Sequence, residues 1–200
     1  MDFRKLDRTA VLETVRLLGL AGAHDWDRPT PCAGWTLRDL VAHMAGQHHG
    51  FAAAATGGGA DLAVWHPTDL GADPQAAYGV AADAVLDAFA RPGVLHTEFD
   101  LPEISTSRRF PASIAISFHL LDYVVHGWDV AKTLGVPLEL DQEVVETASA
   151  IALRVPDDER RLGPDALFQP ALPARSGAPA LDLVLTSLGR SPQWSVQAAR

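Results

Sequence analysis

Three polar side chains recur at helical spacing in the otherwise apolar stretch HLLDYVVHGWD, residues 119–129. Asp122 and His126 are four residues apart, so on a helix their side chains lie about 5–6 Å apart and can reach one metal ion. His119 precedes Asp122 by one turn and is an alternative ligand on the same stripe. The stripe borders an expected apolar face, which consists of Ile114, Leu121, Val125 and Trp128. The spacing therefore favours a chelating pair, although a buried, hydrogen-bonded pair that only orients the helix has the same spacing.

A third ligand is available in the segment PTPCAGWTLRDLVAH, residues 29–43. Thr36 followed by Asp39 predicts the start of a helix, with the threonine as N-cap. His43 then lies two turns into that helix. Two histidines and one carboxylate suit zinc above all, and also nickel or iron(II). Three protein ligands leave a coordination position open, which chemistry on a bound water or thiol requires.

Other polar residues near these segments receive separate interpretations. Asp129 follows the second histidine of the pair by three residues, so it could hydrogen bond the free nitrogen of that ring or anchor a loop. His48 and His49 follow His43 by five and six residues, and this offset predicts that they face solvent or a pocket rim. No base or cation beside Cys32 can be identified in the sequence, so a packing role is favoured over a nucleophile. The tryptophans that flank the two segments are expected to pack at the end of a helical bundle: Trp35 and Trp128.

The helical periodicity and the turn residues predict a mainly α fold. Apolar spacing, a Pro at a helix start and a Gly followed by Pro at a helix end place the elements. The expected helices span residues 3–22, 37–55, 74–90, 112–134 and 140–154, with a short one at 181–188. A short β-hairpin is expected between 94–99 and 108–110. We expect a single domain over 1–200, with a bundle at about 3–155 and an irregular segment at about 156–200 packed on it.

The composition restricts the possible partners. The chain has 200 residues, 48% of them hydrophobic, and a net charge of −9. This charge argues against nucleic-acid and anionic-membrane partners, because both would be repelled. The sequence shows neither a signal peptide nor an apolar stretch long enough to span a membrane, and its one cysteine fits a reducing compartment, so we expect a cytoplasmic protein. A stripe of small residues would allow a homodimer and comprises Ala77, Ala81, Ala84 and Ala88.

Three stretches of the chain carry a family resemblance: PTPCAGWTLRDLVAHMAG, HLLDYVVHGWDVAKTLG and LGRSPQW. Together they resemble actinobacterial metal-binding proteins related to the N-terminal domain of mycothiol-dependent maleylpyruvate isomerase, within the DinB-like superfamily. The resemblance implies a DinB-like bundle of four long helices with additional C-terminal helices. It also implies a metal site made of His43, Asp122 and His126. The characterised isomerase carries Glu at the position of Asp122.

The candidate site and the resemblance together leave three classes of function. In the first, a divalent metal ion activates a low-molecular-weight thiol, mycothiol if the resemblance extends to the cosubstrate, in a transferase or isomerase. A metal-dependent hydrolase on the same site is a variant of this class. In the second, the bundle binds a metal or a ligand without turnover. In the third, the three ligands are neighbours without a function.

Overall fold

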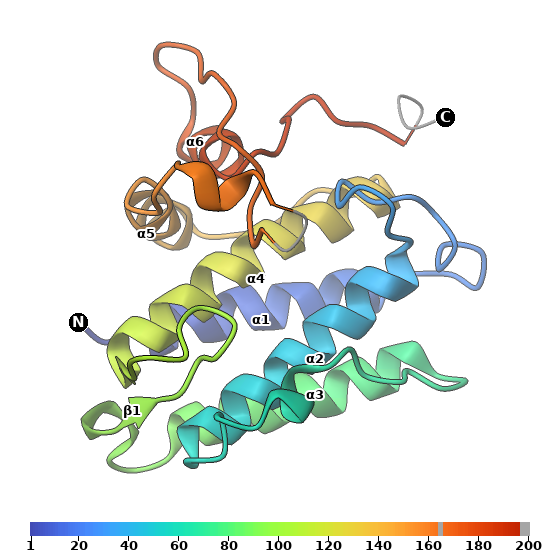
Figure 1. Ribbon diagram of the computed structural model, residues 1–200. Coiled ribbons are helices and arrows are strands. Elements are labelled where there is room, and N and C mark those ends of the chain that lie inside the picture. Colours follow the sequence, from blue (N-terminus) through green and yellow to red (C-terminus); the bar gives the residue numbers. More distant parts are fainter. Residues whose placement is uncertain (164–165, 197–200) are drawn as a thin grey trace.

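Four long helices form the body of the computed structural model, which describes residues 1–163 and 166–196 (Figure 1). They are α1 (Arg4–Leu18), α2 (Leu37–Ala55), α3 (Pro74–Ala90) and α4 (Ala112–Leu134). The pairs α1 with α4 and α2 with α3 pack most extensively, and α1 with α3 and α2 with α4 close the bundle. The predicted mainly α fold with a four-helix bundle is thus confirmed.

Local signals explain where these helices begin and end. Thr36 and Asp39 form a reciprocal capping box at the start of α2. Gly135, in the left-handed conformation at φ +73°, ends α4. The first helix is shorter than predicted and ends at Leu18. The Gln75 side-chain amide donates to the carbonyl oxygens of Leu18 and Ala21, at 2.8 and 2.9 Å. These carbonyl groups are thereby satisfied outside a helix.

Helix α4 is the centre of the bundle and is buried on most of its circumference, since α1, α2 and α5 all pack against it. The prediction of one apolar face was wrong at its first turn, where Ile114 is 42% exposed. Ala115 and Ile116 are fully buried instead. A helix surrounded by neighbours has no single buried face, so its periodicity does not indicate which positions are exposed.

The predicted hairpin is present and is shorter than expected. Strands β1 (Glu98–Phe99) and β2 (Phe110–Pro111) pair antiparallel, with Phe99 opposite Phe110. The 3₁₀ helix η2 (Val94–His96) precedes them. Both paired phenylalanines are buried, so the hairpin fixes the two ends of a loop over residues 100–109 beside the bundle.

The segment between α2 and α3 contains the 3₁₀ helix η1 (Leu62–Trp65) and packs closely on α2. Two helical glycines permit this approach. A Cβ at Gly46 would lie 2.4 Å from the carbonyl oxygen of His66, and one at Gly50 would lie 2.2 Å from the ring of Trp65. The absence of side chains at these two positions is therefore required for the packing of this segment.

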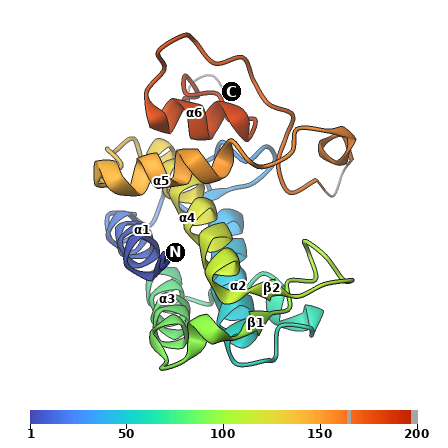
Figure 2. The same cartoon turned by 90° about the vertical axis from the view of Figure 1, so that its left-hand side faces the viewer.

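Beyond α4, α5 (Gln142–Ala152) packs on the bundle, and α6 (Ala180–Ser187) packs on the side of α5 that faces away from it (Figure 2). The connection includes the 3₁₀ helix η3 (Glu159–Arg161). Arg161 is 5% exposed and anchors this irregular segment by donating hydrogen bonds to four carbonyl groups. The acceptors are Val155, Pro156, Gln169 and Ser187. The division of the chain into domains stays a prediction.

The alanine stripe of α3 lies partly inside the bundle, where Ala81 and Ala88 are buried and α3 packs against α1 and α2. The stripe is therefore used within one chain, and a homodimer stays a prediction. Among the described residues, none of the helices combines the length and the apolarity that crossing a bilayer would need.

Candidate metal centre

The three predicted ligands come together between α2 and α4. Donor atoms of His43, Asp122 and His126 all lie within 4.8 Å of one another. The Nε2 atom of His126 is 3.4 Å from Asp122 Oδ1. The rings of His43 and His126 meet edge to face, with centroids 5.5 Å apart. The structure thus brings together His43 and Asp122, which are 79 positions apart in the chain.

A buried carboxylate holds the second nitrogen of His126. Asp129 is fully buried, and its Oδ2 atom is 3.0 Å from His126 Nδ1. A neutral imidazole that donates from Nδ1 has its lone pair on Nε2, the atom that faces Asp122. Metal-binding histidines in proteins are commonly oriented in this way. The donor set and its outer carboxylate therefore fit a divalent metal ion.

Cys32 and Arg190 both hydrogen bond the buried Asp129. The Cys32 thiol donates to Asp129 Oδ2 at 3.3 Å, and Arg190 Nη2 donates to the same oxygen at 3.2 Å. Arg190 Nη2 also lies 3.3 Å from the Cys32 sulfur. Cys32 packs against the core, as expected, and it also contacts a carboxylate and a cation that could not be identified from the sequence. The atoms of Cys32, His126 and Asp129 form a second group within 4.8 Å, although the guanidinium already provides positive charge there.

The electrostatics of the two histidines are opposite. Burial, reinforced by the nearby His126 and Arg190, lowers the pKa of His43 to about 4. Burial alone would also lower the pKa of His126, but Asp122, Asp129 and Cys32 outweigh it and raise that pKa well above its ordinary value. Burial would raise the pKa of Asp129, and Arg190 and His126 outweigh it and lower that pKa. In the metal-free protein, His43 is therefore a ready neutral ligand near pH 7, whereas His126 must first lose a proton.

The surroundings of the site include residues that sequence reasoning missed or interpreted differently. The ring centroid of Trp35 lies 5.0 Å from that of His43 and the residue is 37% exposed, so it borders the site. Gln47, one turn after His43, donates to Glu103 at 3.0 Å. Burial raises the pKa of Glu103. Glu103 belongs to the loop over residues 100–109, where the sequence shows no periodic signal that could have identified it.

The family model described as the mycothiol maleylpyruvate isomerase N-terminal domain matches residues 8–131. The chain belongs to this family. The matched range contains His43, Asp122, His126 and Asp129, whereas Arg190 lies outside it.

Two relatives match this chain over most of its length. Two Mycobacterium tuberculosis proteins, MT0763 of strain CDC 1551 and Rv0738 of strain H37Rv, are each 29% identical over 187 residues, which is 91% of this chain and 91% of theirs. Both are named as uncharacterized proteins. They are similar to this chain along almost its whole length.

Solved structures establish the fold. The crystal structure of a mycothiol-dependent maleylpyruvate isomerase matches with a TM-score of 0.63 and 15% identity over 95% of this chain and 89% of that chain. A histidine-to-alanine mutant of a mycothiol-dependent maleylpyruvate isomerase matches with the same TM-score over 94% and 88%. The DinB-like fold implied by the sequence resemblance is thus confirmed.

Two further histidines lie in the core. His119, the alternative ligand, is fully buried and uses both ring nitrogens inside the core, on Asp7 at 2.6 Å and on His48 at 3.2 Å. His48 was expected to face solvent or a pocket rim, which is wrong, because it is also fully buried. Helix α2 is enclosed by α3 and α4, so a residue turned away from His43 still meets the core. His119 therefore does not belong to the candidate metal centre.

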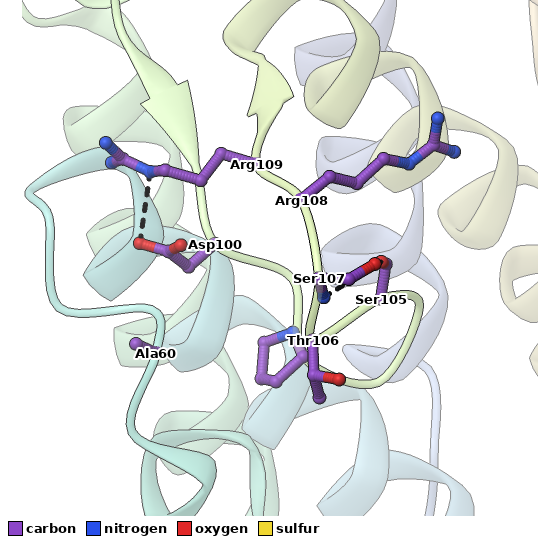
Figure 3. A pocket seen from close by; sticks show the side chains of 8 residues that line it. Ala60, Asp100, Ser105, Thr106, Ser107, Arg108 and Arg109 are labelled. Atoms are coloured by element: carbon purple, nitrogen blue, oxygen red, sulfur yellow. Dashed lines mark hydrogen bonds and ion pairs between the residues drawn. The ribbon is translucent and has the colours of Figure 1, made fainter.

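A separate cavity of about 350 Å³ lies beside the loop over residues 100–109 (Figure 3). Within it, Arg109 pairs with Asp100 at 3.3 Å, and the side chain of Arg108 points away from this pair. Its lining consists of Ala60, Asp100, Pro102, Ser105, Thr106, Ser107, Arg108 and Arg109. The three candidate ligands are not among these residues, so the cavity is distinct from the metal centre.

Proposed function

We propose that this protein binds one divalent metal ion, zinc in the first place and otherwise nickel or iron, through His43, Asp122 and His126. The observation that carries the proposal is the convergence of these donors together with the buried Asp129 behind His126. When bound, the metal ion would stabilise the deprotonated form of a thiol or water at its open position. The side chains of this chain determine which of these ligands is favoured.

The charges around the site favour an anionic ligand. Asp122 is the one carboxylate of the proposed ligand set, so a divalent ion would keep an excess of one positive charge. The outer carboxylate of Asp129 is balanced by Arg190, 3.2 Å away. An incoming thiolate would neutralise the remaining positive charge, whereas a neutral ligand would leave it in place.

The best-supported activity is therefore that of a thiol-dependent transferase or isomerase in the cytoplasm, with mycothiol as the cosubstrate. The family membership and the fold shared with a mycothiol-dependent maleylpyruvate isomerase support this assignment. A metal-dependent hydrolase or a non-catalytic metal- or ligand-binding bundle are the alternatives. The thiol-dependent enzyme and the hydrolase both require the metal ion, and they differ in what occupies its open position.

The test begins with the metal and proceeds to the thiol. Metal content and zinc binding are measured for the wild-type protein, for His43→Ala and for the control His66→Ala, since His66 is exposed and outside the ligand set. We expect one metal ion per chain in the wild type and the control, and loss of binding in His43→Ala. Equal binding in all three would overturn the metal centre.

Calorimetry of the metal-loaded protein with mycothiol then separates the alternatives. Thiol binding that releases a proton, requires the metal ion and accompanies turnover of maleylpyruvate or conjugation of other electrophiles supports the enzyme. Metal binding without any thiol binding at millimolar mycothiol contradicts it and leaves the non-catalytic bundle. Hydrolysis of ester or amide substrates in the absence of thiol would identify the hydrolase.

A further inference from the structure

A chain of hydrogen bonds, called the ring below because both of its ends lie on α1, passes through all four long helices in the core. Asp7 of α1 meets His119 of α4 at 2.6 Å, and His119 Nε2 meets His48 Nδ1 of α2 at 3.2 Å. The other nitrogen of His48 meets the hydroxyl of Tyr78 on α3 at 3.2 Å, and Tyr78 meets Thr14 at 2.6 Å. Thr14 returns the ring to α1. None of the five side chains is more than 1% exposed.

The donor and acceptor roles in this ring can be assigned from one end. The Thr14 hydroxyl donates to the carbonyl oxygen of Val11 at 2.7 Å, which uses its only proton. The 2.6 Å contact with Tyr78 must then be donated by the Tyr78 hydroxyl. Because that phenol has no second proton, the 3.2 Å contact between His48 and Tyr78 requires a proton on His48 Nε2.

The assignment continues to the other end of the ring. Burial, with smaller effects of His119 and His49, lowers the pKa of His48 far below its ordinary value, so this imidazole is neutral and has one proton. Its Nδ1 is therefore an acceptor, and His119 Nε2 must donate to it. A proton also lies in the 2.6 Å bond between His119 Nδ1 and Asp7. The pair then contains an imidazolium beside a carboxylate, or a neutral imidazole beside a carboxylic acid.

We propose that the ring of Asp7, His119, His48, Tyr78 and Thr14 is a buried proton-binding site, which holds one proton between Asp7 and His119 and has no net charge at neutral pH. The opposite direction of donation, from Thr14 towards Asp7, would leave the ring with a negative charge in the core. This site is separate from the metal centre and does not depend on the proposed function.

The surroundings of Asp7 and His119 favour the neutral ring. Among the described residues, the second carboxylate oxygen of Asp7 is buried and has no hydrogen-bond partner. The rings of Phe51 and Phe89 face His119 edge-on, with centroids at 4.8 and 5.2 Å. An unpaired negative charge is costly in such an apolar environment, and the shared proton removes it.

The titratable groups near the ring come from two helices. Tyr123 of α4 stacks on His48 with centroids 4.1 Å apart, and burial raises its pKa well above the ordinary value, so it is neutral. The negative charge of Asp122, also on α4, acts on Tyr78. His49 of α2 acts on His48. Helices α1 and α3 contribute the ring members Asp7 and Tyr78 themselves, and the negative Asp122 favours retention of the proton.

Nuclear magnetic resonance of the imidazole nitrogens tests the direction of the ring in the wild-type protein. With ¹⁵N-labelled histidine at pH 7–8, we expect His48 to be protonated on Nε2 and unprotonated on Nδ1, and His119 to be protonated on Nε2. The variant His48→Gln assigns the signals. A His48 ring protonated on Nδ1 would show the opposite direction and overturn the proposal.

Proton uptake on folding gives a second test. Above the ordinary histidine pKa of about 6.5, the unfolded chain has a charged Asp7 and a neutral His119, one proton fewer than the folded ring. This site alone should therefore increase the unfolding equilibrium constant about tenfold for each unit by which the pH is raised between pH 7.5 and 9. In Asp7→Asn the amide group can donate to His119 Nδ1 without any proton uptake.

The comparison uses urea denaturation at several pH values for the wild type, Asp7→Asn and the exposed control Asp2→Asn. We expect the Asp7→Asn variant to lack the tenfold dependence, and the control to retain it. Equal slopes for the wild type and Asp7→Asn would overturn the proposal. If Asp7→Asn does not fold, the tautomers of the wild-type protein decide.

Discussion

Gly46 provides a test of how closely the segment around residues 62–68 packs on the helix that carries His43. A Cβ at this position would lie 2.4 Å from the carbonyl oxygen of His66 and 2.9 Å from its carbonyl carbon. Both are backbone atoms, so the segment itself must move. Alanine would gain up to about 1 kcal/mol in helix propensity. Overpacking costs about 1–3 kcal/mol, and the nearby hydrogen bond from Thr68 N to Ala42 O, at 2.9 Å, contributes about another 1 kcal/mol if it breaks. We therefore expect Gly46→Ala to lower the free energy of unfolding by about 1–3 kcal/mol.

The matched control is Gly79→Ala in α3, where a Cβ would have no described neighbour within 4 Å. This variant should be about 0.5–1 kcal/mol more stable than the wild type, because only the helix propensity changes. Urea denaturation with unchanged m-values measures both. At this chain length, 1 kcal/mol corresponds to about 2–4 °C in Tm, so the two variants should shift Tm in opposite directions. A Gly46→Ala protein as stable as the wild type, beside the expected gain in Gly79→Ala, would refute the close packing.

Three further predictions concern the metal centre. Asp129→Asn should weaken zinc binding by about 10–100-fold, because it weakens the hold on His126; competition with a chelating dye measures this, and unchanged affinity would contradict the role of Asp129. The pKa of His43 is about 4 and that of His126 is raised, so zinc binding at pH 5–6.5 should release one proton and not two, and the zinc affinity should fall tenfold for each pH unit by which the pH is lowered. Calorimetry in buffers of different ionisation enthalpy counts the released protons, and a count of two would show that His43 is charged. Cys32→Ser should be tolerated, because a hydroxyl preserves both hydrogen bonds, whereas Cys32→Val should lower the free energy of unfolding by about 1–3 kcal/mol, because Asp129 and Arg190 each lose a partner. Equal stability of the two variants in thermal denaturation would argue against these contacts.

The parts of the fold that could be predicted depend on neighbours in sequence. The capping residues Thr36 and Asp39 identify the start of α2, and Gly135 identifies the end of α4, because each acts through hydrogen bonds within one turn. The four-residue spacing of Asp122 and His126 predicts their proximity for the same reason. Their meeting with His43 requires α2 to pack against α4, which the family resemblance implied and the spacing alone did not.

The parts that could not be predicted depend on contacts between distant segments. Arg190 reaches Asp129 across 61 residues, and Glu103 reaches Gln47 across 56 residues from a loop without periodicity. The burial of His48 has a similar cause, since periodicity gives its direction on α2 but not which helices cover that direction. Long-range polar contacts of this kind follow from the packed arrangement of the helices.

The contrast between two histidines of α4 explains why one is a candidate ligand and the other is not. His126 has Nδ1 on the buried Asp129, while Nε2 faces Asp122 and the partly open side of His43. His119 has a carboxylate on Nδ1 as well, but its Nε2 is used by His48 within the closed core. A lone pair can bind a metal ion only where the nitrogen is free and an ion can reach it. The same residue type, seven positions earlier on the same helix, therefore serves the proton ring and not the metal centre.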